Sequence, residues 1–219
     1  MSERSFVHNV ATVVLVVAAA SCSRGPTKPE ADPAKLKALA TQMIRTTPAP
    51  AAAPACTQAK LAGAVVMTQR TALLMSGGTL SDNPEYAEWI HPTELDAPAA
   101  RVLIDPAATT VAKRQAAAEL LQAPRYLVYQ VTMVNVPMAL GVKELKRGAV
   151  GMRAIGYDKT GVATCVTVFT VQNDREVSER AMDKSDRATM DPAIIKELRD
   201  DLRAQVIKTT SSLVAGLPP

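Results

Sequence analysis

Hydrophobic and polar residues change their spacing several times along the 219-residue chain, and these changes divide it into segments. The first apolar run, residues 10–20, contains no charged side chain and is followed by Ser21 and Cys22. A helix needs about 20 apolar residues to cross a bilayer, so this run is too short for a membrane span. Its length is typical of an export signal, which predicts that the protein leaves the cytoplasm.

The segment after Cys22 predicts a tether, then a short helix, then a second linker. Residues 23–33 carry three prolines and charges of both signs, a composition typical of extended, solvated chain. Residues 34–47 place apolar side chains on one face of a helix: Leu36, Leu39, Ala40, Met43 and Ile44. This helix either docks on the folded domain or lies on the membrane surface. Residues 48–55, rich in alanine and proline, form the second linker.

Helical signals dominate the first part of the folded domain. Apolar positions predict one helix over residues 57–76, and Gly77 can supply the left-handed residue that ends it. Asn83 and Pro84 predict the start of a short turn through Trp89. A further helix is expected to begin at Asp105 and Pro106, run through Leu121 and end before Pro124.

Strand signals follow. Residues 125–137 are rich in β-formers on both faces, which predicts a central strand covered on two sides. Residues 149–157 and 162–172 have the same character and are joined by the turn-forming residues 158–161, which predicts a hairpin closed at Gly161. "KELKR", residues 143–147, is expected to be an exposed loop between strands, with an anion or partner site as the alternative.

The last element is the clearest amphipathic helix. Asp191 is placed to cap it and Pro192 to begin it, and apolar side chains then recur every four residues: Ile194, Leu198, Leu202 and Val206. Helices, then strands, then a helix indicate an α+β fold. We expect a three-stranded antiparallel sheet flanked by helices, with a long C-terminal amphipathic helix, in one domain over residues 56–217.

Composition limits the function classes. Hydrophobic residues make up 47% and charged residues 21% of the chain, which is typical of a folded protein and excludes wholesale disorder. Aromatic residues make up only 3%, and the net charge of +4 is spread over both signs. Nucleic acid is therefore not an expected partner.

Ala19, Ala20, Ser21 and Cys22 resemble the lipobox of bacterial lipoproteins. The resemblance implies a diacylglycerol on Cys22, cleavage of residues 1–21, and a lipid-anchored tether over residues 22–55. Ser23 stands where aspartate would retain the protein in the inner membrane, which implies the outer membrane, facing the periplasm. An ordinary signal peptide and an uncleaved helical anchor remain the alternatives.

The cysteine count predicts a disulfide. If Cys22 carries lipid, Cys56 and Cys165 remain as an even pair in an oxidising compartment. We expect them to bond and to fasten the first helix of the domain to its sheet. The alternative is two unpaired thiols, with Cys165 acting as a small buried apolar residue.

The candidate chemistry centres on His91, the only histidine after the signal region. Glu85, Glu88 and His91 have the spacing of one helical face, but Pro92 interrupts that geometry. We therefore expect a solvated acidic turn, with no metal and no cofactor. The expected function is a non-enzymatic binding or scaffold domain, anchored by lipid, for another component of the cell envelope, such as a protein. The alternative is an envelope hydrolase or metal-dependent enzyme using His91 and the nearby carboxylates.

Overall fold

The structure is a computed structural model that describes residues 31–46, 53–78, 92–141, 144–183 and 192–218. It contains helices and strands in this order: α1 (Pro33–Arg45), α2 (Gln58–Leu61), β1 (Ala64–Thr68), α3 (Gln69–Ser76), η2 (Thr93–Leu95), α5 (Pro98–Ile104), α6 (Thr110–Leu121), β2 (Arg125–Asn135), β3 (Met138–Gly141), β4 (Glu144–Lys146), β5 (Ala149–Asp158), β6 (Ala163–Gln172), α7 (Arg175–Asp183) and α8 (Pro192–Gly216). In these ranges no helix has the length and apolar character to cross a membrane.

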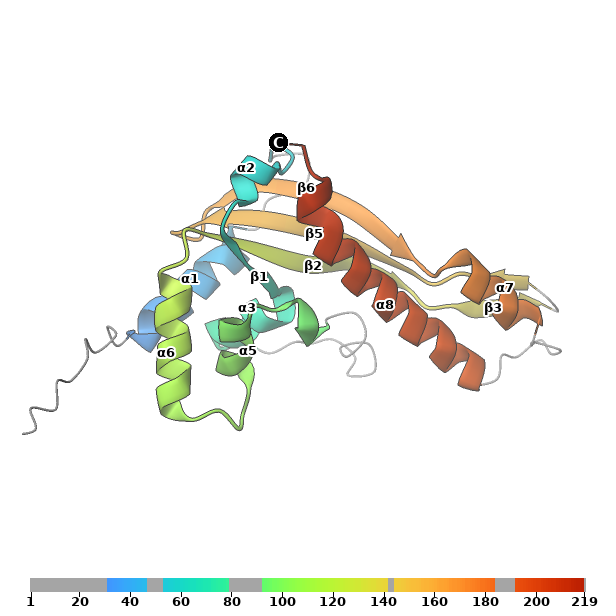
Figure 1. The fold of residues 1–219 in the computed structure, drawn as a ribbon, viewed down its shortest axis with the longest axis horizontal. Helices are drawn as coiled ribbons and strands as arrows, with labels where there is room; N and C mark the ends of the chain where they lie inside the picture. The colour runs from blue at the N-terminus through green and yellow to red at the C-terminus, as the bar shows by residue number, and fades with distance from the viewer. Residues whose placement is uncertain (1–30, 47–52, 79–91, 142–143, 184–191, 219) are drawn as a thin grey trace, which may run out of the picture.

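The main sheet has four strands in the order β1-β2-β5-β6 (Figure 1). β2 pairs with β5 and β5 with β6 in antiparallel fashion, and the expected hairpin closes at Gly161, where φ is 82°. β1 lies parallel to β2. The α+β class is confirmed, but the expectation of three antiparallel strands is wrong, because the sheet has a fourth strand and is mixed.

The extra strand comes from a region expected to be one helix. Residues 57–76 divide into α2, β1 and α3, and the break falls at Gly63, where φ is 72°. β1 contains adjacent β-branched residues, Val65 and Val66, which pair with β2 across a long stretch of sequence. This pairing overrides the helical spacing of the apolar positions. Gly77 ends α3 with a φ of 80°, as expected.

The helix expected from Asp105 begins later. α5 ends at Ile104, and the Asp105 carboxylate accepts a hydrogen bond from the Ala107 backbone N–H at 2.8 Å. Thr109 then caps α6 by accepting from the Ala112 backbone N–H at 3.2 Å. The Asp-Pro pair therefore forms a turn between two helices, because the better-placed cap is four residues further on. The short turn expected at residues 83–89 lies outside the described residues.

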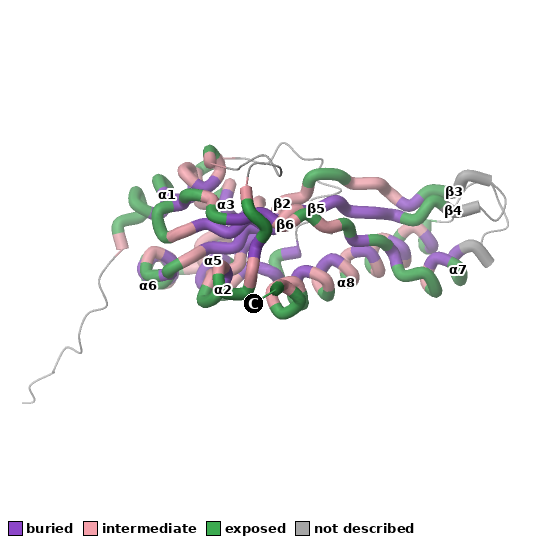
Figure 2. Tube along the Cα trace, turned by 90° about the horizontal axis from the view of Figure 1, so that it is seen from above, coloured by how far each residue is buried: buried purple, intermediate pink, exposed green. Residues whose placement is uncertain are grey.

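Helices cover both faces of the sheet (Figure 2). α1, α3, α5 and α6 share a core with one face, to which β2 contributes Tyr126 and Val128. α1 buries Leu36, Leu39, Ala40 and Met43 in this core, so it docks on the domain, and the membrane-surface alternative is wrong. The other face carries the disulfide and packs against α8.

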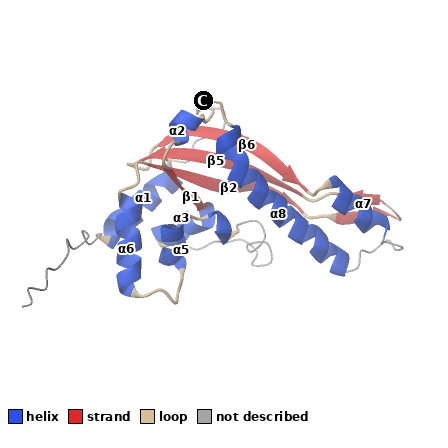
Figure 3. Ribbon diagram, viewed as in Figure 1, coloured by secondary structure: helices blue, strands red, loops and turns tan. Residues whose placement is uncertain are grey.

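α8 buries the predicted stripe, but against two different partners. Leu202 and Val206 belong to the core of the sheet, whereas Ile194 and Leu198 pack with Ala181 of α7. The four-helix layer sits at one end of the sheet, while β2, β5 and β6 run on toward α7 (Figure 3). In the described part of the chain, helices therefore cover one face of the sheet along only part of its length.

Candidate binding surface

The predicted acidic cluster is only partly described. Glu85, Glu88 and His91 lie outside the described residues. Glu94, close behind them in sequence, forms an ion pair with Arg203 of α8. A backbone hydrogen bond and this arginine hold the pKa of Glu94 below its ordinary value. Among the residues that the structure describes, no three histidine, cysteine or acidic side chains lie close enough to hold a metal ion.

The side chain of Asp96 is buried and holds β1 and α3 together through hydrogen bonds. Its Oδ1 accepts from the Thr68 backbone N–H at 2.5 Å, and its Oδ2 accepts from the Thr71 hydroxyl at 2.7 Å. Burial raises the pKa of Asp96, although these hydrogen bonds oppose the shift. The next residue donates from the Ala97 backbone N–H to the Val66 carbonyl at 2.8 Å. This segment thus covers the outer edge of β1.

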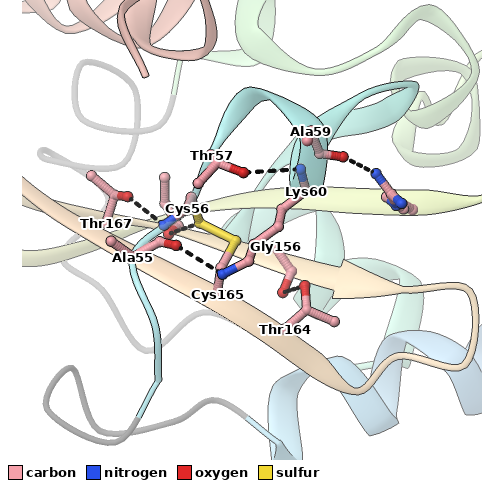
Figure 4. Close-up of a disulfide and its surroundings, with 11 residues drawn as sticks. Ala55, Cys56, Thr57, Ala59, Lys60, Gly156, Thr164, Cys165 and Thr167 are labelled. Carbon is pink, nitrogen blue, oxygen red and sulfur yellow. Dashed lines mark hydrogen bonds between the residues drawn. A yellow bond between two sulfur atoms is a disulfide. The ribbon is translucent and has the colours of Figure 1, made fainter. Parts of the chain in front are cut away.

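The disulfide joins Cys56 to Cys165, with the two Cα atoms 4.8 Å apart and both residues fully buried (Figure 4). Cys56 directly precedes Thr57, the N-cap of α2, so the bond fastens the start of this short helix to β6. The Cys56 backbone N–H donates to the Thr167 hydroxyl at 3.3 Å. Gly156 lies beneath the bond, where an added Cβ would come within 2.6 Å of the Cys165 sulfur.

Among the described residues, the outer edge of β6 is covered only at its beginning. The Val166 backbone N–H donates to the Pro54 carbonyl at 2.9 Å, away from β5. Because backbone groups alternate in direction along a strand, those of Val168, Thr170 and Gln172 also point away from β5. No described residue outside the sheet forms a hydrogen bond with these backbone groups. Figure 1 shows this part of β6 along the upper margin of the molecule.

The described residues also leave the sheet face beside α1 uncovered past the helices. Val128 and Ile155 form the last row of side chains that the helices cover. We call the next two rows the open sheet face. The first row contains Gln130, Arg153 and Val168, and the second contains Met133 and Thr170. Val168 is 58% exposed and Met133 45% exposed. Gln130 accepts a hydrogen bond from the Arg153 guanidinium.

A small cavity of about 110 Å³ lies where the open sheet face meets the helices. It is lined by Met43, Ile44, Gln69, Ala72, Val128, Gln130, Ile155 and Tyr157. This volume is well below the roughly 300 Å³ of ordinary ligand pockets. A cavity of this size is therefore too small to enclose an ordinary small-molecule ligand.

The basic segment "KELKR" has a structural role at its end. Residues 144–146 form β4, so the expectation of a loop is wrong for them. Arg147 donates to the Asn173 carbonyl. Asn173 is buried, and its side chain accepts from the Gly148 backbone N–H at 2.9 Å and donates to the Leu198 carbonyl at 2.6 Å. This network joins the sheet to α8.

Neither the edge of β6 nor the open sheet face was identified from the sequence. One signal was available: residues 163–172 contain no charged residue and no proline, although natural edge strands commonly carry them. Comparisons with protein family models, with curated proteins and with solved structures find no match. The surface must therefore be interpreted from its own chemistry.

Proposed function

We propose that this protein is a lipid-anchored binding domain of the bacterial cell envelope that holds another envelope protein on its open sheet face. The observation that carries the proposal is the face itself. Val168 and Met133 expose apolar side chains there, and both flank the Gln130 and Arg153 pair. Methionine and arginine are enriched where proteins bind one another, and the buried centre of such an interface is more apolar than the surface around it.

Features outside the open sheet face support a location in the cell envelope. The lipobox-like residues ending at Cys22 provide an anchor on a membrane. The bond between Cys56 and Cys165 suits an oxidising compartment such as the periplasm. The tether before α1 allows a small domain to reach a partner near the membrane while remaining attached.

Site-specific cross-linking in growing cells tests the proposal. A photoreactive amino acid is placed at Met133, in the open sheet face, and in a second strain at Val111 of α6. Val111 is 63% exposed and lies on a different element, so it is a matched exposed apolar control. We expect a discrete envelope-protein adduct from position 133 that is absent from position 111. The same adducts from both positions, or no adduct from position 133, would contradict the proposal.

A substitution in the Gln130 and Arg153 pair provides a second test of where the partner binds. Arg153→Glu reverses a charge in the centre of the open sheet face, at a position that belongs to neither apolar core of the sheet. We expect this change to remove the adduct at position 133 while the purified variant keeps the circular dichroism of the wild type. An undiminished adduct would show that the partner binds elsewhere.

A further inference from the structure

The open part of β6 is an unusual edge for a natural sheet. At the opposite side of the sheet, the backbone of β1 is covered through Ala97, and the start of β6 is covered through Pro54. Past that point Val168, Thr170 and Gln172 present three sets of backbone donors and acceptors to one side. The strand has no lysine, glutamate or proline to discourage pairing.

We infer that β6 pairs with β6 of a second copy of this chain, in antiparallel fashion across a twofold axis. The pairing would join two four-stranded sheets into one continuous sheet. It goes beyond the proposed function, because it holds whether or not the open sheet face binds another protein.

The chemistry of β6 fits a copy of itself. A register centred on Thr170 sets it opposite Thr170 of the second copy and sets Val168 opposite Gln172. These pairs would form about six backbone hydrogen bonds, two for each hydrogen-bonded pair. Because the strand carries no charge, self-pairing brings no like charges together, whereas a charged strand would repel its copy.

The symmetry also suits two copies on one membrane. Antiparallel neighbours in a sheet are related by an axis perpendicular to the sheet, so equivalent faces stay on the same side. α1, from which the tether leads, and the open sheet face share one side of the sheet. Both tethers would therefore leave from one side of the dimer, and the two open sheet faces would form one wider surface.

Sedimentation of the full chain in a mild detergent tests the pairing. We expect the wild type to be a dimer that dissociates on dilution, with little response to salt. Val168→Lys places a charge on the edge, and Thr170→Pro removes a backbone donor that points away from β5. Each should raise the dissociation constant by about tenfold or more. Val111→Lys, which changes a similarly exposed valine on α6, should leave the dissociation constant unchanged.

A cysteine at position 170 tests the register. Hydrogen-bonded antiparallel pairs have Cα atoms about 5.5 Å apart, which is within disulfide range. Thr170→Cys should therefore give a covalent dimer on mild oxidation, and Val111→Cys should not. A monomeric wild type at every concentration would overturn the inference. So would a dimer that both edge variants leave intact, even if cross-linking at Met133 still captures an envelope protein.

Discussion

At the scale of single residues, Asp96 shows how a buried polar group can organise a junction. Its carboxyl group accepts hydrogen bonds from Thr68 and Thr71, where β1 passes into α3. The backbone of its neighbour Ala97 closes the edge of β1. Burial nevertheless raises the pKa of Asp96, so the folded protein holds this proton more tightly than the unfolded chain does.

The raised pKa predicts a specific pH dependence. The contribution of Asp96 to the free energy of unfolding should be greatest below the ordinary value of 3.8, where both states are protonated. It should decline as the pH rises from there to the folded-state pKa. Asp96→Asn removes the titrating group and keeps an acceptor for the Thr68 N–H. Urea unfolding at several pH values should show the wild type losing stability relative to Asp96→Asn as the pH rises.

Asp96→Ala separates the charge from the hydrogen bonds. It leaves the buried Thr68 N–H without its acceptor, so we expect it to be less stable than Asp96→Asn by about 1–3 kcal/mol. A difference between wild type and Asp96→Asn that does not change with pH would show that Asp96 titrates alike in the folded and unfolded states.

At the scale of elements, the sequence predicts what local signals determine. The hairpin of β5 and β6 follows from β-rich runs around a turn with Gly161, and α8 follows from a four-residue apolar repeat. β1 could not be predicted in this way, because its five residues sit within a helical pattern. Its conformation depends on pairing with β2, about 60 residues away.

The candidate binding surface could not be predicted from the sequence for the same reason: it depends on contacts between distant segments. The absence of charge in residues 163–172 is visible in the sequence, but that β6 is an edge strand depends on the strand order. Likewise, the sequence shows that α1 has an apolar face. It does not show that this face packs in the same core as Val128 and Ile155. Periodicity identifies a face that must be buried and leaves its partner undetermined.

The stripe of α8 predicts contrasting effects for two neighbouring positions. Leu198 is fully buried against Ala181 and Ile194, so Leu198→Ala should lower the free energy of unfolding by roughly 2–5 kcal/mol. Lys196 lies on the exposed side, with its side chain 77% accessible in an ion pair with Asp200. Lys196→Ala should change stability by less than about 0.5 kcal/mol. Urea denaturation measures both, and equal losses would contradict this orientation of α8.

At the scale of the whole molecule, the docking of α1 shortens the tether that the proposed lipid anchor would use. The helix expected to lie within the tether belongs to the main core, so the folded body already includes Pro33. Residues 23–32 alone would then connect Cys22 to it. At about 3.1 Å per residue, an extended chain of that length spans roughly 30 Å. If Cys22 carries lipid as we propose, the open sheet face would therefore stay close to the membrane.

Attachment through this short tether requires a lipid on Cys22. We expect labelling with radioactive palmitate to detect that lipid. Label should enter the wild type and be lost in Cys22→Ser. Replacing Cys56 and Cys165 together by serine should leave it in place, because those residues bond to each other. Two or three acyl chains anchor a protein stably, whereas a single chain binds only marginally. Exported Cys22→Ser protein should therefore move from the membrane to the soluble fraction. Equal labelling of wild type and Cys22→Ser would show that Cys22 carries no acyl chain, and the domain would need another means of attachment.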